Sequence, residues 1–520
     1  MKHVICWTLS IFVSTLAFAA STEPHRCSRA CGGVRRYDLE IDPGKTFQTI
    51  EHFGASDCWT MQKLGGWSDE NRERLADLLF DVEKGIGLTS WRVNLGAGLD
   101  EGIGLTSWRT AETFEIAPGE YDWTRLANQR RFIKDAKARG IEQFIAFANS
   151  PPRRMTRNGH TFCTPEIGTT NLKEGMEPDF ATYLADILDH FVNHPDEEER
   201  IPFTWISPLN EPNWDWNNSS QECCRASNAD IKRVALALDA ELKKRELPVN
   251  ILLTESGSPQ SSYAPGLQRR KKSGVLNGDY IDSFCGDKDI APIMNGVFAG
   301  HSYSADGMPR TITICREKLN KKMQEYPDFR YWQTEYCILR GPYPSDGGGQ
   351  RDMSMKMAIN VARVMHCDFT IAQATAWDWW LAVSPHNFKD TLIFTDWREP
   401  GDEESILLPK FFYTFGHFSK FLRPGSQRIE VRGDQCVAAL MSSAYVLDDT
   451  IIIILINAAN APMPVKLNIR GIRANKDTPP LTAYVTTDNL HDNISESKPV
   501  QLNRFFHVPG RSIMTLTAKR

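Results

Sequence analysis

Two glutamates stand where apolar segments rich in β-branched and aromatic residues give way to polar loops. Glu211 follows the segment IPFTWISPLN, and Glu335 ends the segment RYWQTE. Both segments are typical of buried strands, and Pro212 ends the first because proline has no N–H for the ladder. Two carboxyl groups facing one cleft supply an acid that protonates a leaving oxygen and a carboxylate that attacks the adjacent carbon. An isolated Asn-Glu-Pro is also an ordinary strand-ending turn. The residues at the other strand ends must therefore distinguish a catalytic role of Glu211 from a purely structural one.

Polar and aromatic residues also end the other predicted strands. In chain order, these candidate substrate-binding residues are Arg92, Asn94, Asn149, Asn210, His301, Tyr303 and Trp377. Each has a purely structural explanation, since arginine pairs with any carboxylate, a buried histidine is commonly a core residue and tryptophan packs well. Their joint occurrence at successive strand ends favours one shared site.

The surroundings of the two glutamates suggest separate roles. We expect Arg92 to hold Glu335 ionised, as a nucleophile requires. Glu211 is followed by aromatic residues, so we expect its pKa to be raised and the group to act as the proton donor. Trp214 and Trp216 are candidate walls of a sugar cleft, because the apolar faces of sugars stack on flat rings. The pattern predicts a two-carboxylate site for glycoside hydrolysis.

A strand-helix alternation over residues 51–420 must position these side chains. The predicted strands span residues 52–56, 88–96, 142–149, 201–209, 250–254, 296–303, 330–334 and 369–377. Helices are predicted from a cap at Ser68 and over residues 123–139, 178–192, 229–245 and 353–365. This predicts an α/β fold, a (β/α)₈ TIM barrel whose strands all end at one mouth. The octapeptide GIGLTSWR occurs at 85–92 and 102–109, but only the first copy continues as a strand, and we expect no repeat architecture.

From about residue 421 the pattern becomes short and β-rich. The predicted strands span residues 427–432, 436–441, 450–457, 465–469, 481–487 and 512–517. They indicate an antiparallel β-sandwich side domain over residues 421–520. The alternating stretch 37–50 predicts a strand-turn-strand pair, and residues 21–50 are expected to complete the sandwich with N-terminal strands.

The N-terminal residues indicate the location of the protein, and the composition limits the partners it can bind. Residues 1–20 combine a short basic start, an apolar run and a small-x-small site, which predicts a signal peptide and a secreted or periplasmic protein. No later run is long and uncharged enough to suggest membrane insertion. The net charge of −5 argues against nucleic acid as a partner. We expect a monomer whose partner is a polysaccharide or oligosaccharide.

The chain has 12 cysteines, and an exported protein permits disulfides. Cys27 with Cys31, and Cys223 or Cys224 with a distant partner, are the pairings considered. Their spacing lacks the paired CxxC and histidine pattern of a zinc site. We expect no metal and no cofactor.

Several motifs together resemble glycoside hydrolase family 30. They are WRVNLGAG, FANSPPRRMTRNG, ISPLNEP, HSY, WQTEY and QATAWDWW, and the resemblance covers nearly the whole chain after residue 20. It implies a retaining mechanism with Glu211 as acid/base and Glu335 as nucleophile, on a barrel with a β-sandwich built from both termini. It also implies substrate contacts from Arg92, Asn149, Asn210, His301, Tyr303 and Trp377. The chain departs from the pattern at Arg154, where many relatives carry an aromatic residue before the methionine.

NEPNWDW followed by QECCR is most similar to the endo-β-1,6-galactanase branch, which acts on arabinogalactan side chains. Other branches cleave β-1,6-glucan, glucuronoxylan or glucosylceramide, and an exo-glycosidase stays open. A non-catalytic sugar-binding protein on the same fold is the alternative from a different class. Arg153, Arg154 and Arg157 share one loop and would suit a uronic acid carboxylate, or they form a solvated basic loop.

Overall fold

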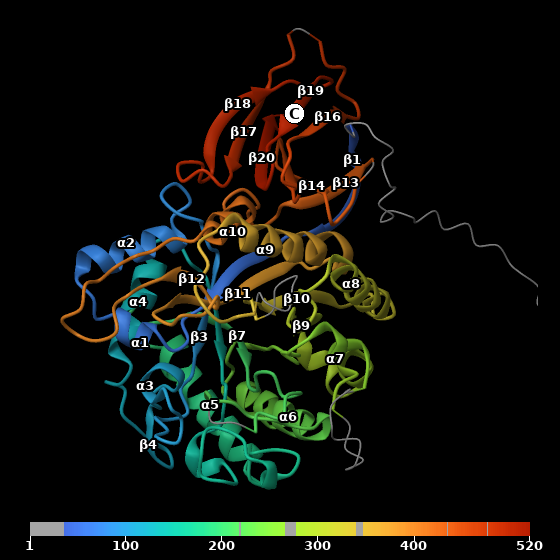
Figure 1. Ribbon diagram of the computed structural model, residues 1–520. Helices are drawn as coiled ribbons and strands as arrows, with labels where there is room; N and C mark the ends of the chain where they lie inside the picture. The colour runs from blue at the N-terminus through green and yellow to red at the C-terminus, as the bar shows by residue number, and fades with distance from the viewer. Residues whose placement is uncertain are drawn as a thin grey trace, which may run out of the picture.

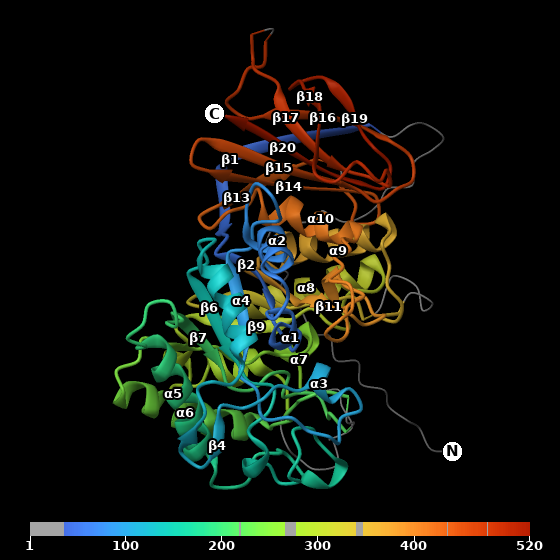
Figure 2. The ribbon, with the colours of Figure 1, turned by 90° about the vertical axis from the view of Figure 1, so that its left-hand side faces the viewer.

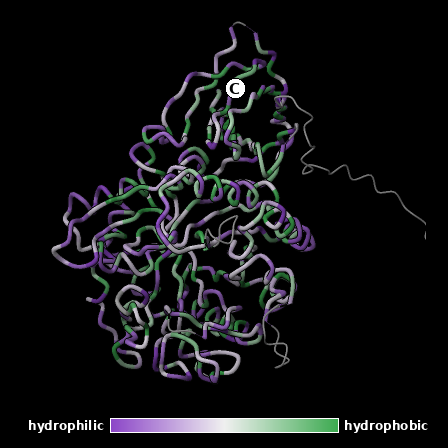
Figure 3. Tube along the Cα trace, viewed as in Figure 1, coloured by the Kyte–Doolittle hydropathy of each residue, from purple (hydrophilic) through white to green (hydrophobic). Residues whose placement is uncertain are grey.

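The computed structural model describes residues 36–217, 220–265, 277–339, 347–433, 435–475 and 477–519. The predicted signal peptide, Cys27 and Cys31 lie outside the described residues. Figure 1 shows a barrel of strands and helices in the lower part of the view and a sheet domain above it. Hydrophilic stretches run along the periphery of both parts (Figure 3).

Eight parallel strands form the barrel. They are β2 (His52–Ser56), β3 (Ser90–Asn94), β6 (Gln143–Phe147), β7 (Phe203–Ser207), β8 (Asn250–Ile251), β9 (Val297–His301), β10 (Arg330–Glu335) and β11 (Ala376–Ser384). Their order is β8-β7-β6-β3-β2-β11-β10-β9. Beyond β8 the chain closes the ring, since Leu253 O accepts from Ala299 N at 2.8 Å and Ser256 O from His301 N at 2.7 Å. The predicted (β/α)₈ barrel is confirmed.

Amphipathic helices connect the strands. The longer ones are α2 (Asp69–Phe80), α4 (Ala127–Lys137), α5 (Glu177–Val192), α6 (Asn228–Lys244), α8 (Pro309–Met323), α9 (Met355–Cys367) and α10 (Lys410–Ser419), and the shorter ones are α1 (Met61–Leu64), α3 (Thr106–Arg109) and α7 (Pro259–Tyr263). Ser68 caps α2 by accepting a hydrogen bond from Asn71 N, as its sequence signal predicted. Among the described residues, no helix combines the length and the apolar character that a membrane span requires.

The last barrel strand lies later in the chain than predicted. Residues 369–372, predicted as strand, belong to a π-helical turn (Asp368–Ala372) that continues α9. Gln373 takes a left-handed φ of 58° and ends that turn, so β11 starts at Ala376. Periodicity cannot separate a short buried strand from a buried helix end, because both are apolar throughout. Trp377 therefore lies near the start of a long strand, which also pairs with the unpredicted strand β12 (Thr391–Phe394).

The side domain is one nine-stranded sheet that encloses its own apolar core. Its strands are β1 (Tyr37–Thr49), β13 (Gln427–Arg432), β14 (Leu440–Leu447), β15 (Thr450–Asn457), β16 (Met463–Ile469), β17 (Leu481–Thr486), β18 (Ser495–Val500), β19 (Phe505–Val508) and β20 (Ser512–Lys519). Their order is β18-β17-β20-β15-β14-β13-β1-β16-β19. The sequence did not predict β18 and β19, and the strand predicted at 436–441 lies at 440–447 instead.

The N-terminal stretch adds one strand to this sheet rather than two. Residues 37–49 form the single strand β1, with a register shift between Asp42 and Thr46 where a turn was predicted. The Asp42 carboxylate accepts from Gly44 N at 3.0 Å, so the DPG sequence forms a bulge. β1 pairs antiparallel with β13 and parallel with β16, so the sheet is mixed rather than antiparallel. Figure 2 shows this blue strand among the orange and red strands of the C-terminal part.

The cysteines differ from the expected pairing. Cys223 and Cys224 are both free and buried, so neither forms the bond to a distant partner that the sequence left possible. Cys436, which the sequence did not single out, is disulfide-bonded.

Helices α9 and α10 lie between the barrel and the sheet domain (Figure 1). His417 on α10 is fully buried, with Nδ1 2.8 Å from Thr515 Oγ1 on β20 and Nε2 2.9 Å from Thr486 Oγ1 on β17. Burial lowers the pKa of His417 to about 3. The two domains thus share a neutral imidazole at their contact.

This histidine should make the protein less stable in acid. In the unfolded chain the imidazole takes up a proton near pH 6.5, but in the folded chain only near pH 3, so stability falls as the pH drops between these values. From pH 7 to pH 5 the loss from this group is about 2 kcal/mol of unfolding free energy. His417→Gln keeps hydrogen-bonding groups without a titratable ring, and urea unfolding at both pH values should show a smaller difference for it. His491→Gln, an exposed position in the same domain, should behave as wild type. Equal pH dependence of His417→Gln and wild type would contradict this.

Candidate active site

Glu211 and Glu335 face each other at the barrel mouth. Glu211 lies in the loop after β7, Glu335 is the last residue of β10, and both are buried, with 5% and 2% of their surface exposed. One carboxylate oxygen of each, together with one ring nitrogen of His301, lie within 4.8 Å of one another. The fold thus brings the two predicted carboxyl groups together.

The backbone around Glu211 turns its side chain into this group. Glu211 has a left-handed φ of 47°, which is rare for a residue with a side chain, and its N–H donates to Glu255 O at 3.0 Å. A Cβ on Gly257 would lie 2.8 Å from Glu211 Oε1 and 2.1 Å from Trp214 Nε1. Only glycine leaves room there for the carboxylate and the indole. Backbone strain of this kind is concentrated at functional sites.

His301 lies between the carboxylates. Its Nδ1 is 2.9 Å from Glu211 Oε1 and 3.5 Å from Glu335 Oε1, and its Nε2 is 3.0 Å from Glu255 Oε2. Burial lowers the pKa of His301, but these three carboxylates outweigh that effect and raise this pKa to about 10. Both ring nitrogens therefore carry protons at neutral pH. Glu211, His301 and Glu335 each place one potential ligand atom within this group, and binding of a metal ion would have to displace the proton of His301.

Glu255, which follows β8, is a member of the site that the sequence analysis missed. Its carboxylate contacts His301, accepts from Arg92 Nη2 at 3.3 Å and accepts from the Thr334 hydroxyl. Burial opposes its ionisation, but Arg92 and His301 lower the pKa of Glu255 to about 2. The segment LLTESG carried the same signal as the other strands, a polar residue just past a predicted strand, and the same rule would have found it.

Glu335 is held at both oxygens. Tyr303 OH donates to Oε1 at 3.0 Å and Arg92 Nη1 donates to Oε2 at 3.0 Å. Burial raises the pKa of Glu335 above its ordinary value and Glu211 adds to this, while His301 and Arg92 lower it. Arg92 thus lowers this pKa, as expected, but the desolvation of the buried carboxyl outweighs the nearby cations and the net shift is upward. Arg92 is fully buried, so it orients Glu335 from behind.

Three asparagines form a row beside Glu211. Asn210 Nδ2 donates to Asn149 Oδ1 at 3.1 Å, and Asn149 Nδ2 donates to Asn94 Oδ1 at 3.1 Å. Asn94 N in turn donates to the buried carboxylate of Asp57 at 2.8 Å. The buried Asn210 Oδ1 has no hydrogen-bond partner among the residues that the structure describes. Its capacity to accept a hydrogen bond is therefore unused within the described part of the chain.

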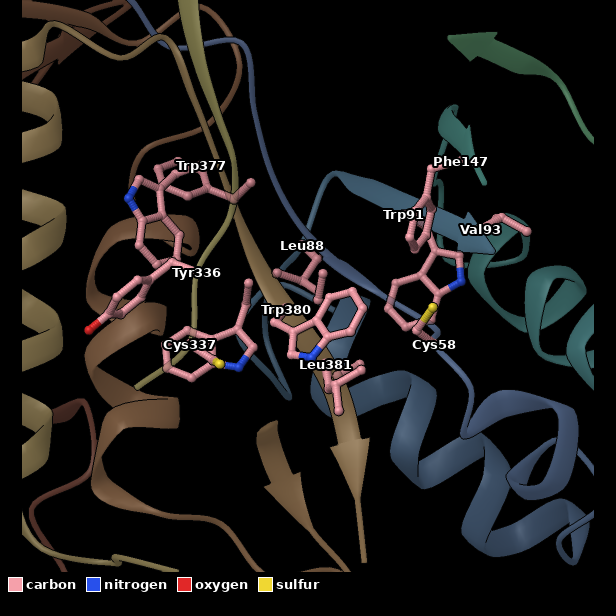
Figure 4. Close-up of a cluster of buried hydrophobic side chains, with 14 of the residues drawn as sticks. Cys58, Leu88, Trp91, Val93, Phe147, Tyr336, Cys337, Trp377, Trp380 and Leu381 are labelled. Carbon is pink, nitrogen blue, oxygen red and sulfur yellow. The ribbon is translucent and has the colours of Figure 1, made fainter. Parts of the chain in front are cut away.

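Two of the three candidate tryptophans, Trp216 and Trp377, lie in different places. Trp216 is half-buried, and its indole N–H donates to Glu211 O at 3.0 Å, which ties this ring to the loop of Glu211. Trp377 is fully buried and its Nε1 donates to Asp368 Oδ2 at 2.9 Å. Figure 4 shows Trp377 beside Tyr336 within the apolar core. Trp377 thus belongs to the core under the site, because β11 starts only one residue before it instead of ending at it as predicted.

The arginine loop is mostly committed to other groups. Arg154 forms two hydrogen bonds to Glu115, at 2.7 and 2.6 Å. Arg153 Nη1 donates to Leu99 O and Arg157 Nε donates to Leu172 O. These contacts hold the loops of the barrel mouth together. They also leave Arg154 without a free pair of guanidinium N–H groups for the carboxylate of a uronic acid.

A (β/α)₈ barrel with two facing carboxyl groups at the carboxyl ends of its strands is the architecture of a glycoside hydrolase. The chain matches the family model of O-Glycosyl hydrolase family 30 over residues 36–394. It belongs to that family and is an O-glycosyl hydrolase that acts on a carbohydrate.

Relatives and solved structures agree with this membership. The chain is 27% identical to an endo-beta-1,6-galactanase of Hypocrea rufa over 401 residues, 72% of this chain and 71% of that protein. It is 24% identical to the glucuronoxylanase XynC of Bacillus subtilis over 263 residues, 48% and 55% of the two chains. A conserved exported protein from Bacteroides fragilis superposes with a TM-score of 0.80 at 28% identity, covering 92% of this chain and 100% of that one. A family 30 subfamily 8 xylanase from Clostridium acetobutylicum has the same fold, with a TM-score of 0.65 at 19% identity over 93% of this chain and 100% of that one.

Removing the charge of Glu255 should disturb the site without touching the two facing carboxyl groups. Glu255→Gln withdraws one of the carboxylates that keep His301 protonated, so the alkaline limb of the pH–kcat profile should move to lower pH. We expect kcat to fall about 10- to 100-fold, which is about 1.4–2.7 kcal/mol of transition-state stabilisation. Glu51→Gln is the matched control. Glu51 directly precedes β2 and pairs with Arg330, at the end of the barrel opposite to the site. A lower kcat with an unshifted pH profile would contradict the role of Glu255.

Proposed function

We propose that Glu211 is the general acid/base and Glu335 the nucleophile of a retaining glycosidase, as the family resemblance implies. The observation that carries this proposal is the short gap, within 4.8 Å, between a carboxylate oxygen of Glu211 and one of Glu335. Retaining enzymes place their carboxyl groups about 5–5.5 Å apart, whereas inverting enzymes need about 6.5–9.5 Å for an intervening water. The gap leaves room for direct attack on the sugar.

The proposed reaction has two displacements. Glu211 gives its proton to the glycosidic oxygen while a Glu335 oxygen bonds to the anomeric carbon, and the leaving sugar departs as an alcohol. Water then gives a proton to Glu211 and its oxygen replaces Glu335 at the same carbon, so the configuration is retained. Tyr303 and Arg92 hold the Glu335 oxygens in place. His301 supplies a fixed positive charge between the two carboxyl groups and donates to Glu211.

We infer that Asn210 and Trp216 position the sugar. Asn210 precedes Glu211, and its free Oδ1 suits a hydroxyl next to the reacting carbon. Asn149 and Asn94 fix the orientation of that amide through the row of hydrogen bonds. The half-buried Trp216 adjoins the Glu211 loop and offers a flat apolar face.

The proposed substrate is β-1,6-galactan, cleaved in endo fashion on arabinogalactan side chains by a secreted monomer. The endo-beta-1,6-galactanase relative supports this choice, since its match extends over 72% of the chain. Arg154, whose fork is engaged with Glu115, weakens the glucuronoxylanase alternative.

Azide should distinguish the two glutamates. Glu211→Ala and Glu335→Ala should each reduce kcat on an aryl β-1,6-galactobioside, about 10²- to 10⁴-fold for the loss of the acid/base and at least as much for the nucleophile. Azide should restore turnover of Glu211→Ala with a β-glycosyl azide as product, because the covalent intermediate still forms. With Glu335→Ala it should give the α-glycosyl azide, because azide replaces the nucleophile. The anomeric proton couplings in the NMR spectrum report the configuration, and the reverse pattern would exchange the two roles.

A polymer panel should identify the substrate. We expect reducing-sugar release from β-1,6-galactan at least tenfold faster than from β-1,6-glucan or glucuronoxylan, with a ladder of oligosaccharides. Release of monosaccharide alone would indicate an exo enzyme. Binding of all three polymers by the wild-type protein without cleavage would support the non-catalytic alternative.

A further inference from the structure

A polar cavity lies away from the barrel mouth, between the end of α9 and the strands β1, β13 and β14. Figure 1 shows these elements where the barrel meets the sheet domain. Its volume is 680 Å³, which is the size of a pocket for a small organic ligand. The lining mixes apolar residues such as Phe47 and Met441 with basic and hydroxyl side chains. It shares no residue with the candidate active site.

Arg428 is the unusual residue of this cavity. It is only 8% exposed, its guanidinium carbon lies 3.8 Å from the centre of the Phe47 ring, and its Nε donates to Gln48 Oε1 at 2.8 Å. No carboxylate among the described residues pairs with it, and burial lowers the pKa of Arg428 to about 10. A buried guanidinium is normally matched by an anion, because an unpaired buried charge is costly. Its two outer nitrogens are left for a ligand.

Other lining groups favour an anion with further polar groups. Among the described residues of the lining, the charged side chains are Lys45, Arg428 and Arg432 against Glu430, which already pairs with both Lys45 and Arg432. Ser443 lies on the same face of the sheet as Arg428, since Arg428 is paired with Tyr445 two residues further along β14, and its buried hydroxyl oxygen has no hydrogen-bond partner in the described part of the chain. An unsatisfied buried hydroxyl costs free energy until a ligand supplies its partner.

We propose that this cavity binds an acidic sugar, with the carboxylate of a uronic acid on the Arg428 guanidinium. The planar fork of arginine matches a carboxylate through two parallel hydrogen bonds. A carboxylate alone would fill a small part of the cavity, and a sugar hydroxyl would satisfy Ser443. The site is separate from the site of hydrolysis and does not depend on which polymer is cleaved.

Calorimetric titration of the full chain with sodium glucuronate, glucose and sodium acetate tests the proposal. The wild-type protein should bind glucuronate saturably and at least tenfold more tightly than either glucose or acetate. Arg428→Gln should weaken glucuronate binding at least tenfold. Arg470→Gln removes the same charge from an exposed residue of the same domain, which pairs with Asp42, and should bind within twofold of wild type.

Thermal unfolding separates a binding role from a structural one. Loss of an unpaired buried charge should leave the Tm of Arg428→Gln unchanged or raise it, whereas a structural role would lower the Tm and leave glucuronate binding intact. Ser443→Ala removes only an unpartnered hydroxyl, and it should keep the Tm while weakening glucuronate binding several-fold. No glucuronate binding by wild type, equal binding of glucose or acetate, or equal binding by Arg428→Gln would each overturn the proposal.

Discussion

The site depends on the charge balance of five side chains buried in mutual contact at the barrel mouth. Glu211, Glu255 and Glu335 are acidic, and Arg92 and His301 are basic. With all five ionised the group carries one negative charge in excess, which burial disfavours, and burial together with Glu211 raises the pKa of Glu335. A glycosidase needs one protonated carboxyl group beside one carboxylate.

The barrel supplies the geometry that this balance requires. Parallel strands end at one mouth, so Glu335 from β10, His301 from β9 and Arg92 from β3 meet although they are far apart in the chain. The irregular backbone lies just beyond the strands, at Glu211 and Gly257, where the chain must leave the sheet and still aim a carboxylate inward. Regular strands thus fix the distances, and the strained turns fix the directions.

The two domains are connected directly by successive secondary-structure elements rather than by a separate linker. β1 leaves the sheet domain directly into β2 of the barrel, and α10 returns the chain from the barrel to β13. Neutral His417 and the cavity beside Arg428 both lie at this contact. Both ring nitrogens of His417 have hydrogen-bond partners, whereas Arg428 has no carboxylate partner among the described residues. The contact therefore combines a firmly packed part with a part open to a ligand.

The octapeptide GIGLTSWR shows how much local sequence leaves open. Its first copy enters strand β3, where Arg92 contacts Glu335 and Glu255. In its second copy the last four residues form helix α3, and Arg109 pairs with Asp390. Identical residues thus take opposite structures, because the neighbouring strands and loops decide which one buries the apolar side chains.

The sequence by itself determined the barrel, the side domain and the pair Glu211 and Glu335, because hydrophobic periodicity and polar strand ends are local signals. Only the tertiary structure decided that Glu255 completes the charge group, that Arg154 is engaged with Glu115 and that Trp377 lies in the core. It also showed that burial outweighs Arg92 and raises the pKa of Glu335. The reason is that burial and pairing depend on segments distant in the chain, and desolvation of a carboxyl group is set by all of them together.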